Sequence, residues 1–209
     1  LCGVPLTQHT KSIIFRREGV QLVGIVERLA AILGSRDGFN SQTGMWRLPT
    51  MPGADNGRTL ELGSVKEISD WIKYQGRDHD FIGYDEITHF TEMQVRTLMG
   101  WLRTTKAGQR CRVVMAGNPP TDSDGEWVIR FFAPWLDPNH PNPAKPGELR
   151  WFTTIKGQDV ECADERSFVL FKGEPLYDFD PSEFSPEKII SPRSRTFVPS
   201  RVTDNYFYV

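Results

Sequence analysis

Two adjacent carboxylates, Asp85 and Glu86, stand directly after a short apolar run, FIGY. Such a run predicts a buried strand. Charges at the end of a buried strand are costly unless they have a partner or a function. The first carboxylate can hold a magnesium ion, because magnesium takes hard oxygen ligands and keeps much of its water shell. The second can orient and polarise a water molecule for in-line attack on a terminal phosphate. The pair predicts phosphoryl-transfer chemistry, although two solvated surface acids would give the same letters.

Polar residues also follow two other apolar segments. RVVMAGNPP, which starts at Arg112, is apolar and then breaks at Gly117 and Asn118, while SIIFR ends on Arg16 and is followed by Arg17. In an open α/β sheet, sites form beyond the carboxyl ends of the strands. There an amide can touch a γ-phosphate or the attacking water, and guanidinium groups suit phosphate charge or an acidic partner. We therefore expect carboxylates, an amide and arginines to converge around one pocket.

Two amphipathic segments separate these strands and predict helices. Residues 18–33 carry an apolar stripe that ends at Gly34, and the stripe comprises Leu22, Ile25, Val26, Leu29 and Ile32. Residues 91–105 begin with Thr91 and Gln94 at the spacing of a capping box, and their stripe comprises Val95, Leu98, Met99 and Leu102. Strand, helix, strand, helix, strand predicts an α/β fold with an open, mostly parallel sheet flanked by helices.

The remaining segments predict smaller elements. Residues 37–64 contain MWRLP and RTLELGS around a turn, which predicts a β-hairpin insertion with its tip near Asn56 and Gly57. WVIRFFAPWL predicts a short helix, NHPNPAKPGE a proline-rich connector, and LRWFTTI, SFVLFKG and RTFVPSRV short strands. We expect residues 1–135 to form the main domain and residues 136–209 a small C-terminal subdomain.

Composition narrows the class of protein. A chain of 209 residues, 38% hydrophobic and 25% charged, suits one substantial domain with a smaller appendage. The formal net charge of −2 gives no overall attraction to nucleic acid or to an anionic membrane, so contact with DNA would need a local basic surface. Three widely spaced cysteines without a CxxC pair indicate reduced thiols, and no apolar run has the length of a membrane span.

The glycine-rich turn GxxxxGK[ST], which cradles the β- and γ-phosphates in P-loop ATPases, does not occur in the 209 residues. TKSII, from Thr10 to Ile14, contains Lys-Ser, but no glycine-rich turn precedes it and a strand follows it. Two interpretations follow: either the chain does not hydrolyse nucleotides, or the sequence begins just after this turn and its helix.

Several segments resemble the ATPase half of the terminase large subunits of tailed phages. They are TQHTKSIIFRREGVQLVGIVERLAAIL, YQGRDHDFIGYDEITHFTEMQVRTLMGWLRTT, VVMAGNPP and SRTFVPSRVTDNYFYV, and they occur in the order of that family. The resemblance covers most of the chain. It implies a P-loop NTPase fold of the additional-strand, RecA-like type with a C-terminal lid or linker subdomain. It also implies that a Walker A turn precedes Leu1 and that an RNase H-like nuclease domain follows residue 209.

The resemblance implies a role for each matching residue. Asp85 would be the Walker B ligand of Mg²⁺, and Glu86 would be the catalytic carboxylate that activates water. Gly117 and Asn118 would lie in the coupling motif that follows Walker B. The arginine pair named above would lie near the bound ATP or at a subunit boundary.

In that family, ATP hydrolysis drives the translocation of double-stranded DNA into a procapsid. The resemblance therefore implies four partners: double-stranded DNA, the portal protein, the small terminase subunit, and further copies of the chain in a homo-oligomeric ring. It implies no membrane. The implied location is the cytoplasm of the bacterial host and, transiently, the procapsid.

Two other functions stay open at this point. A non-catalytic α/β scaffold that has lost its P-loop would keep the fold, and a Gly-Lys-Ser/Thr turn encoded upstream of Leu1 would exclude it. Another P-loop ATPase, such as a helicase, would need a second RecA-like domain. A DExH helicase would also have its histidine one position before His89, and helicases typically carry a Ser-Ala-Thr-like triad where AGNPP stands here.

Other polar groups have simpler interpretations. His89 follows Glu86 at the E-x-x-H spacing of di-iron bundles, but the chain has no second copy, so we interpret His89 as a loop or helix-entry residue. Asp178 and Asp180 in YDFD are best explained by a solvated turn rather than by a metal site. A basic set near the C-terminus fits either a DNA backbone or an exposed edge strand: Arg193, Arg195 and Arg201, with Phe197.

Overall fold

The computed structural model of the chain describes residues 9–48 and 57–204. The chain divides into two compact units, 1–128 and 129–209. The division predicted at residue 135 falls within α5 (Ala133–Leu136). Asn56, at the predicted hairpin tip, lies outside the described residues.

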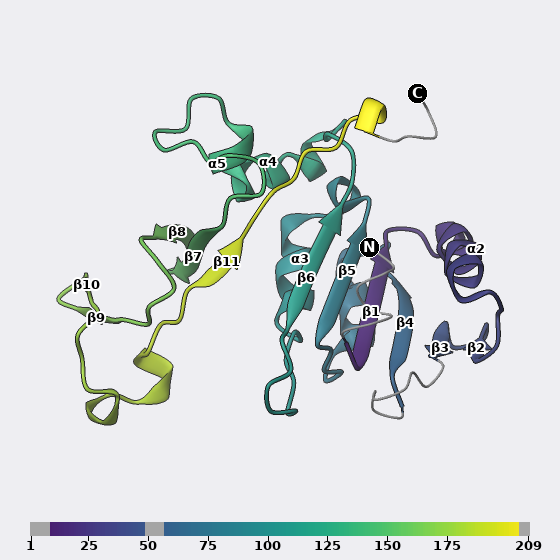
Figure 1. The fold of residues 1–209 in the computed structure, drawn as a ribbon, viewed down its shortest axis with the longest axis horizontal. Helices are drawn as coiled ribbons and strands as arrows, with labels where there is room; N and C mark the ends of the chain where they lie inside the picture. The colour runs from purple at the N-terminus through teal and green to yellow at the C-terminus, as the bar shows by residue number, and fades with distance from the viewer. Residues whose placement is uncertain (1–8, 49–56, 205–209) are drawn as a thin grey trace. The chain divides into compact units, whose positions relative to one another are not determined.

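A six-stranded sheet forms the centre of the first unit (Figure 1). β4, β1, β5 and β6 run parallel to one another, whereas β2 and β3 are antiparallel to their neighbours. The prediction of a mostly parallel α/β sheet is therefore confirmed. In spatial order the strands are β2 (Phe39–Asn40), β3 (Met45–Arg47), β4 (Thr59–Ser64), β1 (Lys11–Arg16), β5 (Phe81–Asp85) and β6 (Arg112–Ala116).

β4 joins the predicted hairpin to the main sheet. It pairs antiparallel with β3, as the hairpin requires, and it also pairs parallel with β1 along its whole length. The sequence did not predict this second pairing, because Glu61 makes TLELGS look half-solvated. Glu61 is in fact buried, and it forms ion pairs with Arg77 and His79.

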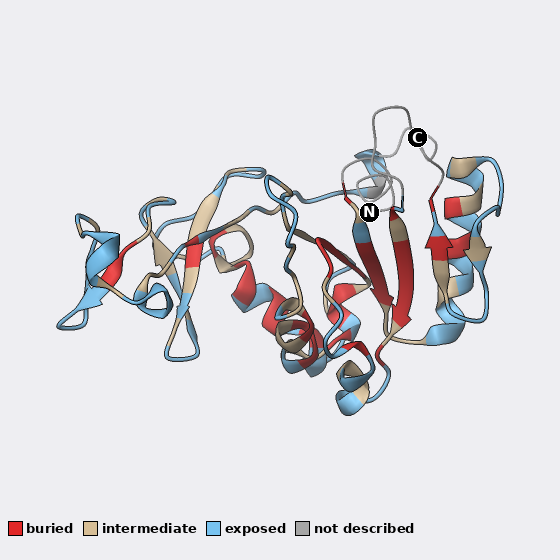
Figure 2. Cartoon of the chain, turned by 90° about the horizontal axis from the view of Figure 1, so that it is seen from below, coloured by how far each residue is buried: buried red, intermediate tan, exposed pale blue. Residues whose placement is uncertain are grey.

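One face of the sheet is covered by α2 (Leu22–Leu33), which follows a short 3-10 helix, η1 (Gly19–Gln21). Its buried residues join a core with the strands, and Gly34 ends the helix with φ +77°, as predicted. The prediction that Ile32 belongs to the buried stripe is wrong, since Ile32 is 48% exposed. It lies about 60° around the helix from Leu29, at the margin of the stripe. Buried residues concentrate on the sheet and on the helix faces that contact it (Figure 2).

A second helix, α3 (Glu92–Met99), begins with the predicted capping box between Thr91 and Gln94. It packs near Tyr84 of β5, whose hydroxyl donates to the Val95 carbonyl over 3.3 Å. The predicted extension to residue 105 is wrong. Gly100 weakens helix propensity, and Leu102 instead forms a bridge with His79.

β6 is the last strand of the described sheet. All five of its residues are half-buried, whereas the inner residues of β1 and β5 are buried. The sequence predicted β6 as a strand covered on both faces, and its edge position is the reason for the difference.

The second unit contains a three-stranded antiparallel sheet and a separate hairpin. The predicted strands LRWFTTI and SFVLFKG are confirmed, whereas RTFVPSRV contains only the last residue of a strand. WVIRFFAPWL forms two short helices. The helices are α4 (Trp127–Phe131), which begins in the first unit, and α5. The strands are β11 (Arg193–Arg195), β7 (Arg150–Ile155) and β8 (Gln158–Cys162) of the sheet, and β9 (Val169–Phe171) and β10 (Glu174–Leu176) of the hairpin.

Six further 3-10 helices connect the elements along the described chain. They are η2 (Ile68–Tyr74), η3 (Ile87–His89), η4 (Ser123–Gly125), η5 (Pro181–Glu183), η6 (Pro186–Lys188) and η7 (Val202–Asp204). Among the described residues, none of the helices combines the length and apolar character that a membrane span requires.

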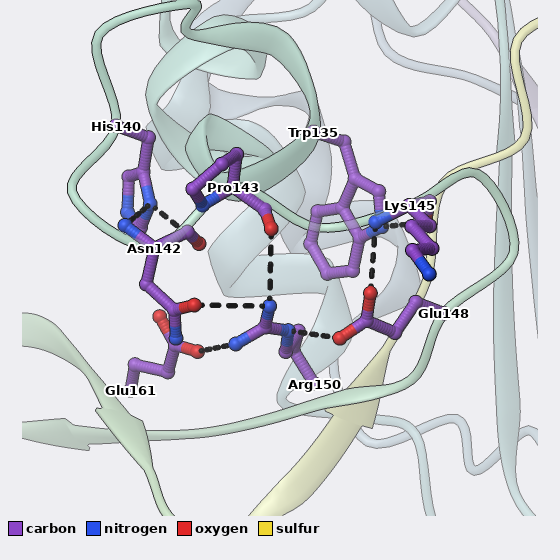
Figure 3. Close-up of polar contacts among 8 residues, drawn as sticks. All are labelled: Trp135, His140, Asn142, Pro143, Lys145, Glu148, Arg150 and Glu161. Atoms are coloured by element: carbon purple, nitrogen blue, oxygen red, sulfur yellow. Dashed lines mark hydrogen bonds and ion pairs between the residues drawn. The ribbon is translucent and has the colours of Figure 1, made fainter.

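Arg150 holds the proline-rich connector against the sheet of the second unit (Figure 3). Its guanidinium forms ion pairs with Glu148, at 2.8 Å, and with Glu161, at 3.0 Å. It also donates to Asn142 Oδ1 and to the Pro143 carbonyl. Because the guanidinium is engaged by the connector and by the neighbouring strand β8, we interpret this cluster as structural.

Candidate functional site

The carboxyl ends of β1, β5 and β6 lie side by side in the sheet. Phe15 of β1 is opposite Tyr84 of β5, and Asp85 is opposite Ala116 of β6. The register therefore brings the residues that follow each strand to one edge. The predicted convergence of three strand ends is present, whereas a pocket between them stays a prediction.

Arg16 and Asp85 meet because of this register. Side chains alternate between the two faces of a sheet, so the residue after Phe15 and the residue after Tyr84 point to the same face. Arg16 Nε lies 3.0 Å from Asp85 Oδ2, and both side chains are only partly exposed. The end of β5 thus carries an ion pair rather than an isolated acid.

Glu86 is held by two neighbouring strands. Its backbone adopts the left-handed conformation, with φ +57° and ψ +60°, which costs a non-glycine residue about 1 kcal/mol. Asn118 Nδ2 donates to Glu86 Oε2 over 3.3 Å, and Arg16 Nη2 lies 3.6 Å from Glu86 Oε1. The carboxylate is therefore directed towards the ends of both β1 and β6.

Glycines allow the segment after β6 to approach the loop after β5, which carries Glu86, closely. A Cβ at Gly117 would stand 3.0 Å from the Ile87 nitrogen, and a Cβ at Gly125 would overlap the Thr88 carbonyl oxygen. The sequence singled out Gly117 but missed Gly125, for which the only signal was a glycine in the loop SDG.

Trp127 adds a second link between this segment and the loop after β5. Its indole Nε1 donates to the Phe90 carbonyl over 2.8 Å. The Trp127 side chain is buried. The loop that carries Glu86 is consequently fixed at both of its ends.

Arg17 points away from the carboxylates. Its Nη1 donates to the His89 carbonyl over 2.9 Å and to Gln94 Oε1 over 3.2 Å. Gln94 is fully buried, and its Nε2 donates to the carbonyls of Val65 and Glu67. The structure therefore brings Arg16, but not Arg17, to Asp85 and Glu86, and a nucleotide contact for Arg17 stays a prediction.

Asp85 and Glu86 are the residues at this edge that could hold a cation, and they supply few ligands. Within residues 9–48 and 57–204, no three or more His, Cys, Asp or Glu side chains gather as a metal cluster. Asp85 and Glu86 offer two carboxylates, and magnesium commonly takes its other ligands from water and substrate phosphates. The guanidinium of Arg16 already occupies a position where these carboxylates stabilise positive charge. The two acids thus fit a hydrated magnesium ion.

The other candidates serve local structure. Asp180 accepts hydrogen bonds from the Ser182 backbone and hydroxyl, as the predicted turn requires, and His89 is an exposed residue of η3. Arg195 lies against the rings of Phe131 and Phe152 and pairs with Asp159, so its guanidinium is engaged inside the second unit.

Comparisons with models of protein families, with curated proteins and with solved structures gave no match.

Proposed function

We propose that the chain is the ATP-hydrolysing part of a terminase large subunit, with a P-loop NTPase fold of the additional-strand, RecA-like type. One observation carries the proposal: Asp85, Glu86 and Asn118 come together at the carboxyl ends of adjacent parallel strands. A carboxylate oriented at this edge suits a water-activating base, and the neighbouring amide suits a phosphate contact.

Each residue has a distinct role in this proposal. Asp85 would hold a hydrated magnesium ion, which would supply charge neutralisation for phosphoryl transfer. Glu86 would accept the proton of the attacking water. Asn118 orients the Glu86 carboxylate through the 3.3 Å hydrogen bond and would contact the γ-phosphate or the water. Gly117 lets the β6 end approach the Glu86–Ile87 peptide closely enough for this contact.

The biological setting in the proposal comes from the sequence resemblance. Hydrolysis would drive double-stranded DNA into a procapsid. The partners would be the portal protein, the small terminase subunit and further copies of the chain in a ring. The work would take place in the cytoplasm of the bacterial host. The order of the matching segments along the chain supports this setting more than any single motif does.

Replacing the proposed base tests the function. In the protein encoded by the complete open reading frame, Glu86→Gln should lower the rate of ATP hydrolysis by about 10²- to 10⁴-fold, because removing a general base has effects of that size. Nucleotide affinity should stay largely unchanged. Hydrolysis is measured by phosphate release and affinity by fluorescent-nucleotide titration.

Glu92→Gln is the matched control, because Glu92 lies on α3 and pairs with Arg96 rather than with the strand ends. This variant should hydrolyse ATP at the wild-type rate. Wild-type turnover in Glu86→Gln would remove Glu86 from its role. Absence of hydrolysis in the wild-type protein would instead favour a scaffold without catalysis.

A further inference from the structure

Arg16 converts the carboxylate pair into a cluster of three charges. Its Nε lies 3.0 Å from Asp85 Oδ2, and its Nη2 lies 3.6 Å from Glu86 Oε1. One guanidinium therefore contacts both carboxylates. The two carboxylates alone carry a formal charge of −2, and the three groups together carry −1. Because the affinity of an oxygen-ligand site for a divalent cation depends on its charge, Arg16 opposes cation binding.

The contact between Arg16 and the acids is suited to exchange. A strong arginine–carboxylate pair uses two parallel hydrogen bonds to one carboxylate, whereas Arg16 divides its contacts between two residues. Its Nε is buried and makes no hydrogen bond of good geometry to the described residues. The side chain as a whole is 21% exposed, so part of it already faces solvent.

We propose that Arg16 is a positioning residue that holds Asp85 and Glu86 together in the absence of a divalent cation and releases them when the cation binds. This inference rests on the proposed function, which requires magnesium at these carboxylates. The register of β1 and β5 determines this contact, because it places Arg16 on the same face of the sheet as Asp85. After release, the guanidinium stays at the same strand end, where a phosphate group is the partner that it suits.

Direct measurement of Mn²⁺ binding to the 209-residue chain tests the proposal without any catalytic readout. The free Mn²⁺ signal in electron paramagnetic resonance reports how much cation each variant takes up. Arg16→Gln should bind Mn²⁺ about tenfold more tightly than the wild type, because a positive charge a few ångströms away is removed. Arg16→Lys keeps the charge and should bind within about threefold of the wild type.

Arg17→Gln provides the matched control. It removes the same charge one residue further on, from a group that bonds the His89 carbonyl and Gln94 instead of the acids. Its Mn²⁺ affinity should stay close to that of the wild type. Circular dichroism confirms that each variant is folded. Equal affinities for Arg16→Gln and the wild type, or an equal gain in Arg17→Gln, would overturn the proposal.

A second substitution separates the inference from the proposed function. Adding Asp85→Asn to Arg16→Gln should abolish the tighter Mn²⁺ binding. If Mn²⁺ binding depends on Asp85 but is insensitive to Arg16, the inference fails and the proposed magnesium site survives. If neither the wild type nor Arg16→Gln takes up Mn²⁺ at the carboxylates, both the inference and the proposed site fail.

Discussion

Adjacent arginines at the end of β1 have different environments because Arg16 is the last residue of the strand, whereas Arg17 lies in the bend that follows it. Arg16 reaches Asp85 and Glu86, whereas Arg17 reaches the His89 carbonyl and Gln94. The sequence predicted both arginines at the site, since composition alone does not distinguish them. Only the register of β1 against β5 decides which one meets the carboxylates.

Arg195 illustrates a charged residue with a structural role. Its guanidinium centre lies 3.7 Å from the Phe131 ring centroid and 4.4 Å from that of Phe152, and Nη2 lies 2.7 Å from Asp159 Oδ2. Arg195→Met should lower the free energy of unfolding by about 2–4 kcal/mol, because a partly buried ion pair and its ring contacts are lost together. Urea denaturation measures the change.

Arg193, in the same strand but exposed, offers the comparison for this prediction. Arg193→Met should change the free energy of unfolding by no more than about 0.5 kcal/mol. Equal losses for the two variants would show that the ring contacts of Arg195 do not stabilise the fold.

His9 should make stability depend on pH. It is buried beside Asp80, and burial, the largest cause, lowers the pKa of His9 below its usual 6.5, while Arg110 and Arg112 lower it further and Asp80 opposes the shift. Folded protein therefore binds the His9 proton less readily than unfolded protein. The free energy of unfolding therefore has its full value above about pH 6.5. It decreases as the pH falls below that value, by at most about 1.4 kcal/mol per pH unit.

Urea midpoints measured between pH 7.5 and 5 on His9→Gln and wild type check this expectation, the range being chosen around the ordinary histidine pKa of about 6.5. The variant should lose less stability on acidification than the wild type. His89→Gln, which changes an exposed histidine, should follow the wild type. A steeper acid loss in His9→Gln would contradict the assignment of a neutral, buried His9.

Among the helices and strands, segments with a clear apolar pattern could be predicted. Strands whose acidic residues are neutralised by partners distant in sequence could not be fully predicted. The parallel strands and the capping box at Thr91 followed from apolar runs and spacing. β4 was predicted as a strand of the hairpin, but its parallel pairing with β1 was not. The buried Glu61 interrupts the apolar pattern of β4 and is compensated by partners distant in sequence. β8 was also missed, since QDVEC carries acids that only cross-strand pairs with Arg150 and Arg195 explain.

The contact between η3 and η4 depends on Gly125. A Cβ there would overlap the Thr88 carbonyl oxygen and stand 2.9 Å from Thr88 Cβ and 3.0 Å from Pro120 Cβ. Gly125→Ala should therefore destabilise the chain by about 1–3 kcal/mol, since backbone atoms must shift. Thermal and urea unfolding measure the loss.

Gly24→Ala is the control, and it should change the stability in the opposite direction. Gly24 lies inside α2, and a Cβ there meets nothing within 4 Å among the described residues. The substitution should stabilise the chain by about 0.5–1 kcal/mol through helix propensity. Destabilisation by Gly24→Ala, or tolerance of Gly125→Ala, would mean that the packing at these positions differs from that described.

At the scale of the whole molecule, the α/β class and the placement of the candidate site at one sheet edge could be predicted. Parallel strands put their carboxyl ends together, so Asp85, Glu86 and Asn118 were predicted as neighbours from strand order alone. Their detailed contacts were not predictable. The left-handed backbone at Glu86 and the close approach of Gly117 depend on how two loops pack against each other.

The proposed function requires that Glu86 and Asn118 act on one reacting group. A double-mutant cycle on kcat for ATP hydrolysis, in the protein from the complete open reading frame, tests this requirement. Asn118→Ala alone should lower kcat, and adding it to Glu86→Gln should cause almost no further loss, because residues that act as a unit are not additive. A double variant whose loss equals the product of the two single losses would place the residues in independent roles and contradict the account.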